Sequence, residues 1–458
     1  MVEKSLVMGH VKPPLQGGRA QLAYVLLAVY LVGAHLRLTF YSSGGSTLIP
    51  NYLMLLAGAI LAVAQFDQFK KTGKSLVVLT LLVIVQPIIT FAPLSGEGFS
   101  ATQSGMQLTA AIVAALAVLY TTSRLTAHGL RKLFLWAWAL LMLTAALENF
   151  GLRTLIQSAQ ATLYGGSNRG IYAADNRDMY LYGQVRPSAF ASEPSFLADS
   201  WAATAALVFL LDKNRGSAAS WIRLILMYGL GFALAPSMKV MFYFVAILVW
   251  HFWPKTRHAF IGLLATLILA GWILYILDAD VLWSRVASSE TGSYFARITV
   301  APQIAAEALR GFPILGYGIG NHEGMLELMQ GVWQSSGGFA RFPHFKPASA
   351  QGLMTNGFWW QWAFVGILGG IVLSYLVVRM LTSLGATNPV RSVVCTWIVW
   401  YGGFGFIDPA SWWILAVFAI PEVARWVSEE KPVNIPTRPN PAKRAPHGTT
   451  ARSGFVGA

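Results

Sequence analysis

Hydrophobic residues along this chain gather in runs of about 15 to 20 residues that are separated by polar segments. An α-helix needs about 20 mostly apolar residues to cross the hydrocarbon core of a bilayer. The pattern therefore predicts an all-α polytopic membrane protein with about 12 transmembrane helices. The predicted spans lie near residues 20–38, 47–66, 75–94, 107–122, 130–148, 194–211, 222–236, 238–252, 259–277, 357–378, 392–407 and 411–427.

The seventh and eighth runs are separated only by the segment Pro236-Ser237-Met238-Lys239. Proline removes a helical hydrogen bond and clashes with the preceding turn, so it favours a break. The segment predicts either a tight hairpin between two spans or one long, broken helix.

Composition supports the membrane assignment. The 458 residues are 55% hydrophobic and only 11% charged, whereas soluble domains carry about 25% charged residues. The mean hydropathy is +0.54. These values exclude a soluble enzyme, a disordered chain and a fibrous protein. A single cysteine, Cys395, forms no intramolecular disulfide.

The net charge of +14 carries an orientation signal, because cytoplasmic connections of membrane proteins are enriched in Lys and Arg. The alternate connections of the predicted topology are short and basic, and they share a face with both termini. We therefore predict a cytoplasmic N-terminus at residues 1–19 that leads into an uncleaved first helix, a transmembrane domain at 20–427 and a disordered cytoplasmic tail at 428–458.

Two long connections fall on the predicted outer face, at about residues 149–191 and 278–355. The second lies between spans 9 and 10 and contains helical patches at Val300–Arg310 and Glu323–Gly331. We predict a small folded cap there, because loops of this length are unusual unless they are functional.

Basic residues on the predicted outer face are mostly arginines. Arginine grips phosphate oxygens with a planar fork and keeps its charge, so this surface suits a phosphorylated ligand held at the membrane. The alternative is compositional, because arginine outnumbers lysine in the whole chain and loop arginines often pair with carboxylates. The outer basic residues are Arg37, Arg153, Arg169, Arg177, Arg186, Lys239, Arg285, Arg297, Arg310, Arg341 and Lys346.

One segment stands out at the outer entrance of the sixth span, Arg186-Pro-Ser-Ala-Phe190-Ala-Ser-Glu193-Pro194-Ser195. Pro194 suits the first position of a helix, with Ser192 or Glu193 as its cap. A helix start of this kind also favours an anion nearby. The alternative is a capped helix end with an Arg–Glu pair and no chemistry.

This segment resembles the signature of bacterial exopolysaccharide and O-antigen polymerases, within the O-antigen ligase/polymerase family. Three further segments in the same order also resemble the family, so that the likeness covers roughly residues 180–375. The chain has Thr355-Asn356 where ligases of the family have His-Asn, and Lys239 where many members have arginine. The three segments are Ser293-Tyr-Phe-Ala-Arg297, Pro313-Ile-Leu-Gly316-Tyr-Gly318-Ile-Gly320-Asn321, and Thr355-Asn356-Gly-Phe358 with Trp362-Ala-Phe-Val-Gly366-Ile-Leu-Gly369.

The resemblance implies a GT-C-like membrane glycosyltransferase that polymerises lipid-linked oligosaccharide repeat units on the outer face of the bacterial inner membrane. It would transfer the growing glycan from a polyprenyl diphosphate donor to a sugar hydroxyl. The expected partners are the polyprenyl diphosphate-linked oligosaccharide, membrane lipid, and chain-length regulator and export proteins of the same pathway, with no nucleic acid.

The resemblance and the chemistry of the side chains together predict which residues form the site. Arg186, Arg297 and Lys239 would stabilise the leaving diphosphate, and Glu193 or His344 would take a proton from the acceptor hydroxyl. Arginines that neutralise the diphosphate make a metal or other cofactor unnecessary. Arg177, Arg341, Asn321, His322 and Asn356 are further candidates for binding the substrate. Four aromatic residues of the tenth span could line a groove for the lipid tail or simply anchor the helix at the interface, namely Phe358, Trp359, Trp360 and Trp362.

Three alternatives remain open at the level of sequence. Asp278-Ala-Asp280 could hold a divalent metal in a glycosyltransferase site, although it also suits a solvated helix end. Within the family, the chain could be an O-antigen ligase that transfers the glycan to a lipid A-core acceptor. It could also be a lipid-linked oligosaccharide flippase, although polar residues gathered in outer loops favour surface chemistry over passage.

Overall fold

A computed structural model describes residues 15–41, 47–95, 98–165, 172, 175–254, 295–342 and 350–424, and side chains at all of these except 68–72, 91–101, 177, 180–181 and 351. The described residues all belong to the compact unit Met1–Trp426, and the predicted cytoplasmic tail lies outside them. The elements are α1 (Gly17–Leu36), β1 (Phe40–Tyr41), β2 (Thr47–Ile49), α2 (Tyr52–Ala64), α3 (Phe66–Ser95), α4 (Gly98–Thr122), α5 (Ala127–Leu147), η1 (Glu148–Leu152), α6 (Arg153–Tyr164), α7 (Asp175–Tyr182), α8 (Pro194–Leu210), α9 (Ala218–Leu234), α10 (Lys239–His251), η2 (Phe295–Thr299), α14 (Ala301–Gly311), α15 (Leu326–Ser335), α16 (Gly338–Arg341), α17 (Ala350–Leu353), α18 (Gly357–Ser383), α19 (Pro389–Tyr401) and α20 (Pro409–Val423).

The helices follow the predicted apolar runs. Eleven of the twelve runs coincide with α1–α5, α8–α10 and α18–α20, and the ninth, at 259–277, lies outside the described residues. Within the described part, five helical stretches are long and apolar enough to cross a membrane, so the chain is a helical membrane protein; its span number and orientation stay predictions. These stretches are Gly17–Leu36, Gly73–Thr90, Thr102–Thr122, Ala127–Tyr164 and Gly357–Ser383.

The structure differs from the predicted elements in two places. The run at 47–66 is not one helix: its first residues form β2, which pairs antiparallel with β1, and α2 then begins at Tyr52. The outer connection predicted from residue 149 is also largely helical, because α5 continues through η1 into α6. Gly151 adopts a φ of 129° in this junction, a conformation that glycine alone adopts readily, and it kinks the helix instead of ending it.

Two other predictions about local structure are confirmed. The helical patches expected at Val300–Arg310 and Glu323–Gly331 correspond to α14 and α15. The chain also breaks at Pro236, between α9 and α10, so the segment is a turn between two helices.

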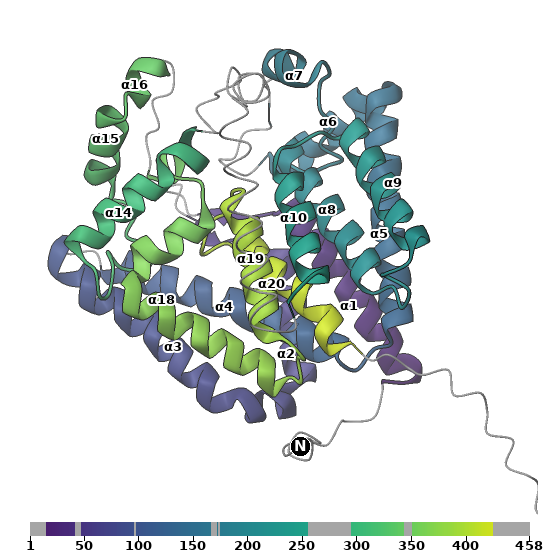
Figure 1. Cartoon of the computed structure of the whole chain (residues 1–458), viewed down its shortest axis with the longest axis horizontal. Coiled ribbons are helices and arrows are strands. Elements are labelled where there is room, and N and C mark those ends of the chain that lie inside the picture. Colours follow the sequence, from purple (N-terminus) through teal and green to yellow (C-terminus); the bar gives the residue numbers. More distant parts are fainter. Residues whose placement is uncertain are drawn as a thin grey trace, which may run out of the picture. The chain divides into compact units, whose positions relative to one another are not determined.

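The helix α8 lies at the centre of one group of helices. It packs against α1, α5, α9, α10 and α20, and Figure 1 shows α5, α8, α9 and α10 standing together. Almost every residue of α8 is buried, as expected for a helix that is apolar on all sides. Its alanines, among them Ala198, Ala202 and Ala206, are fully buried and permit close approach of the neighbouring helices.

Arginines of the basic connections that we predict to be cytoplasmic pair with carboxylates at one set of helix ends. Asp212, after α8, accepts hydrogen bonds from Arg131 at 3.1 Å and from Arg223 at 2.6 Å. Arg391, near the start of α19, binds Glu422 near the end of α20 at 2.5 Å. The opposite ends of α1, α8, α10 and α18 contribute the cavity described below.

Candidate functional site

A cavity of about 570 Å³ lies where α1 ends, where α8, α10 and α18 begin, and beside η2 and the 403–408 turn. It is lined by charged, amide and aromatic side chains from segments that are far apart in sequence. The lining residues used below are Arg37, Tyr41, Thr47, Asn51, Gln103, Ser104, Gln107, Glu193, Phe196, Lys239, Arg297, His322, Glu323, Thr355, Trp360, Phe404 and Asp408.

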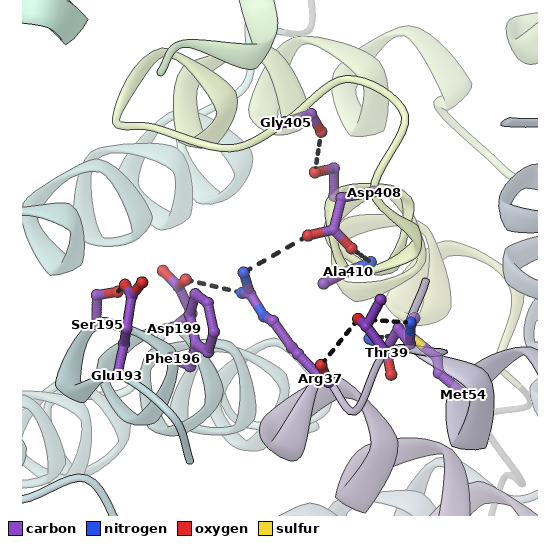
Figure 2. A network of polar contacts seen from close by, with 12 residues as sticks. Arg37, Thr39, Met54, Glu193, Ser195, Phe196, Asp199, Gly405, Asp408 and Ala410 are labelled. Carbon is purple, nitrogen blue, oxygen red and sulfur yellow. Dashed lines mark hydrogen bonds and ion pairs between the residues drawn. The ribbon is translucent and has the colours of Figure 1, made fainter. Parts of the chain in front are cut away.

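Arg37 follows the last residue of α1 and turns the chain there, with a φ of 51°. Its Nη2 donates to Asp199 Oδ2 at 2.9 Å, and its Nη1 lies 3.7 Å from Asp408 Oδ2. The guanidinium also stacks 3.9 Å from the centroid of Phe196. Figure 2 shows it held between the two carboxylates, so its charge is fixed at the wall of the cavity.

Lys239 is the first residue of α10, and its Nζ lies 3.3 Å from Asp199 Oδ2. It also lies 5.0 Å from the centroid of the Phe404 ring. Arg37, Lys239 and Asp199 are 7%, 8% and 4% exposed. One buried carboxylate on α8 therefore holds two buried cations, which limits the directions in which either can move.

Arg297 in η2 supplies the third cation, and its Nε donates to Thr355 Oγ1 at 3.2 Å. Its backbone oxygen accepts a hydrogen bond from Asn356 Nδ2 at 2.9 Å. Asn356 also caps α18 through Trp359 N and reaches Tyr401 O. Asn356 therefore ties η2 to α18 and α19, and it positions Arg297 by way of the backbone.

Carboxylates lie in the same cavity. Glu193 occupies the cap position before Pro194, as predicted, but its side chain does not cap the helix. Its Oε2 instead accepts a hydrogen bond from Ser195 Oγ at 3.0 Å. Asp408 caps α20 through Ala410 N. With Glu323, the described lining holds three carboxylates beside three cations, so the cavity pairs fixed positive charges with possible proton acceptors.

The glycine-rich segment packs into a break in α18. Gly316 and Gly366 have φ values of 66° and 68°, and a Cβ on either one would lie 2.5 Å or less from the backbone of the other segment. From α3, Gln86 donates to Leu315 O at 2.6 Å and Phe364 O at 2.8 Å, and accepts from Ile319 N. These contacts set the position of the turn that carries His322.

His322 lies at the cavity wall, edge-on to Trp360 and Phe364 at centroid distances of 5.0 and 5.2 Å. Its Nδ1 is buried and has no hydrogen-bond partner among the described residues. Burial lowers the pKa of His322 to about 4. The ring is therefore neutral at physiological pH, and it does not supply a positive charge to a ligand.

This pKa predicts a pH dependence of stability. In the unfolded chain, this histidine binds a proton below about pH 6.5. In the folded chain, it binds that proton only below about pH 4. The free energy of unfolding should therefore rise through this window as pH increases, by up to about 3 kcal/mol. The measurement is the difference between the melting temperatures in detergent at about pH 4.5 and about pH 7. This difference should be smaller for His322→Gln than for the parent protein. An unchanged difference in the variant would contradict the assignment.

Arg186, the arginine of the signature, lies outside the residues that line the cavity. Its Nη2 donates to Asp178 Oδ1 at 2.9 Å and to the Tyr172 hydroxyl at 3.0 Å. The Tyr182 ring lies 4.6 Å from its guanidinium carbon. Arg186 is 7% exposed and Asp178 is fully buried. The structure thus places Arg186 in a separate ion pair that fastens α7 to the segment before α8.

Removal of one member of a buried ion pair leaves the other unpaired, at a cost of about 3–5 kcal/mol. We expect Arg186→Ala to lower the melting temperature clearly, whereas Arg153→Ala, whose partner Asp175 is half exposed, should change it little. The double variant Arg186→Met with Asp178→Leu should recover most of the stability. If the stable double variant lacks activity, Arg186 acts on substrate as well.

The remaining predicted residues divide into three groups. Asn321 supports the glycine-rich turn, with bonds to Tyr317 O and Gly324 N. Arg341 is exposed at the end of α16 and does not line the cavity. Arg177 lies in α7, but its side chain is not described, and His344, Lys346 and the Asp278–Asp280 pair lie outside the described residues.

The aromatic residues at the start of α18 also separate. Trp360 lines the cavity, whereas Phe358 and Trp362 contact Trp397 of α19 at centroid distances of 5.7 and 6.1 Å. Trp360 is thus the one member of the predicted lipid groove, among the described residues, that reaches the site.

Sequence reasoning missed two carboxylates of the site, Asp199 and Asp408. The sequence does mark Asp199, because a charged residue inside an apolar span is usually paired and functional. It marks Asp408 more weakly, since aspartate directly before Pro409 is typical of a helix start. The sequence places Arg37 among the outer arginines and gives it no separate role.

The arrangement can bind and stabilise an anionic leaving group through fixed cations, with carboxylates at hand to receive a proton. Among the described residues, no group of three or more His, Cys, Asp or Glu side chains could hold a metal ion. No protein-family model and no curated protein matches this chain in sequence comparisons.

Proposed function

We propose that this chain polymerises lipid-linked oligosaccharide repeat units, transferring the growing glycan from a polyprenyl diphosphate to a sugar hydroxyl. The observation that carries the proposal is the convergence of Arg37, Lys239, Arg297 and Glu193 on one cavity. Two of these four residues, Glu193 and Arg297, come from the segments that resemble polysaccharide polymerases, and Lys239 stands where many members of that family have arginine. The described helices and their membrane character fit a substrate that is anchored in the bilayer.

In the proposed reaction, the oxygen of an acceptor hydroxyl forms a bond to the anomeric carbon of the donor sugar. The bond from that carbon to the diphosphate oxygen breaks, and its electron pair leaves with the diphosphate. Charge therefore builds up on the leaving group, and positioned cations that need no reorganisation lower the barrier most effectively.

Arg37 and Arg297 suit the leaving group because guanidinium groups bind phosphate oxygens in pairs and never lose their charge. Lys239 adds a compact charge to the same cavity, with its Nζ 3.3 Å from the buried Asp199. The pairing with Asp199 fixes Arg37 and Lys239, so that the positions of these two cations do not depend on the substrate.

Glu193 is the residue that we assign to the acceptor proton. One of its carboxylate oxygens is bonded to Ser195, and the other accepts no hydrogen bond from any residue that the structure describes. Asp408 is less available, since it caps α20 and faces Arg37. A proton acceptor beside the attacking oxygen contributes about 10²–10⁴-fold to the rate of such a step.

The finer elements of the topology belong to the same proposal. We place the chain in a bacterial inner membrane with twelve spans, a GT-C-like arrangement, both termini in the cytoplasm and the cavity open to the outer side. Chain-length regulator and export proteins would then act on its product.

A reconstituted assay tests the function. Lipid-linked repeat units, extracted from a strain deleted for this chain, are incubated with the purified protein in nanodiscs, and products are resolved by size. Longer lipid-linked glycans with released polyprenyl diphosphate are expected. Glycan joined only to added lipid A-core would identify a ligase, and movement across the bilayer without elongation would identify a flippase.

A further inference from the structure

The wall of the cavity is chemically divided. Arg37, Glu193, Lys239, Arg297 and Asp408 come from the end of α1, the starts of α8 and α10, η2 and the turn before α20. Most of the uncharged polar side chains instead come from the β-hairpin, from the turn before α2, from α4 and from the turn after the glycine-rich segment. Glu323, which is exposed, is the one carboxylate on these latter elements that lines the cavity in the described structure. The uncharged side is made by Tyr41, Thr47, Asn51, Gln103, Ser104, Gln107 and His322.

Asn51 is the clearest indication that the cavity binds a hydrogen-bond donor. It is 1% exposed, it lines the cavity, and its Oδ1 is buried with no hydrogen-bond partner among the described residues. Its Nδ2 is occupied by Met54 Sδ at 3.3 Å. A buried acceptor left unpaired is costly, so the geometry calls for a hydrogen-bond donor from whatever fills the cavity.

The side chains next to Asn51 also favour a ligand that donates hydrogen bonds. Gln103 Nε2 donates to Thr47 O at 2.6 Å, and Gln107 Nε2 donates to Thr47 O at 3.0 Å. Their amide nitrogens thus hold the hairpin, while their oxygens accept no hydrogen bond from a described residue. His322 adds a neutral ring nitrogen without a partner. A ligand with several hydroxyl groups can donate to the amide oxygens and can pair with the His322 nitrogen in either tautomer, whereas an anion cannot donate to the amide oxygens.

We propose that Asn51, Gln107 and His322 form a subsite for an uncharged sugar, the acceptor end of the glycan. This inference rests on the proposed function. A donor is already oriented by its diphosphate on the cations, whereas an acceptor brings no charge to its reacting end. The acceptor must therefore be positioned by hydrogen bonds and by ring contacts such as those that Tyr41 and Trp360 offer.

The test separates binding of the acceptor from binding of the donor. The acceptor probe is one free repeat-unit oligosaccharide, released from its lipid by mild acid, and the donor is the intact lipid-linked unit. Asn51→Gly removes the amide without strain, because glycine accepts the φ of 49° at this position. We expect a rise of about five-fold in the KM for the acceptor, as for the loss of one hydrogen bond, with the KM for the donor unchanged.

Gln107→Ala should act in the same direction, and Gln184→Ala is its matched control. Gln184 also donates to a backbone oxygen, Ala233 O at 2.8 Å, but it does not line the cavity. Melting temperatures near that of the parent protein show that each variant is folded. Inorganic pyrophosphate should compete with the donor in every variant and should not compete with the acceptor.

Two results would overturn the subsite. An unchanged KM for the acceptor in both variants would mean that water satisfies Asn51, and a rise in the KM for the donor alone would assign this wall to the donor sugar. Failure of the proposed function is a different result, because the parent protein would then elongate neither substrate.

Discussion

Replacing Arg297 by alanine is expected to reduce glycan elongation by about 10²–10³-fold, the usual effect of removing one preorganised group that stabilises developing charge. Arg297 is held in place by Thr355 Oγ1 and by the Asn356 contact to its backbone. Its loss should therefore lower kcat more than it raises the KM for the donor. Product length and rate in the reconstituted assay measure the effect.

Two further variants make this result specific. Arg297→Lys keeps the charge without the planar fork, so we expect an intermediate loss. Arg310→Ala is the matched control: Arg310 lies in α14, 75% exposed, and pairs with Glu307 of the same helix. Full activity in folded Arg297→Ala would remove the diphosphate-binding role from this residue, and an equal loss in Arg310→Ala would show that the effect is unspecific.

Replacing Asp199 by alanine should produce the largest loss of stability at the site. Asp199 Oδ2 binds Arg37 at 2.9 Å and Lys239 at 3.3 Å, and all three residues are more than nine-tenths buried. The variant leaves two buried cations close together without their shared counter-ion. Breaking a single buried pair costs about 3–5 kcal/mol, so we expect a large fall in melting temperature and in folded yield.

The control for this variant is Asp175→Ala, which removes an ion pair with Arg153 whose members are 51% and 31% exposed. Exposed pairs contribute about 0–1 kcal/mol, so its melting temperature should hardly move. Asp199→Asn keeps the size of the side chain and should lie between the two. A parent-like melting temperature for Asp199→Ala would contradict the shared ion pair.

An arginine that lies close to a site residue in the sequence does not necessarily belong to the site. Arg186 lies in the sharpest motif of the chain, only seven positions before Glu193, yet its guanidinium is engaged by Asp178 and Tyr172. Arg37 belongs to no motif and nevertheless lines the cavity. Local pattern reports where a helix starts, but the partner of a long side chain depends on the elements that fold against it.

Apolar run length and proline geometry act over a few residues, so the sequence alone predicts the apolar helices, the break at Pro236 and the helix start at Pro194, but not the β-hairpin or the continuation of α5 into α6. It also placed Glu193, Lys239, Arg297 and His322 among the candidates. Which charged side chains pair with one another depends on how the helices pack. Arg37 and Asp199 are 162 positions apart, and no local property of either segment fixes their distance. Packing of α1 and α10 against α8 brings these groups to one end of the helices, where burial strengthens the interaction between them.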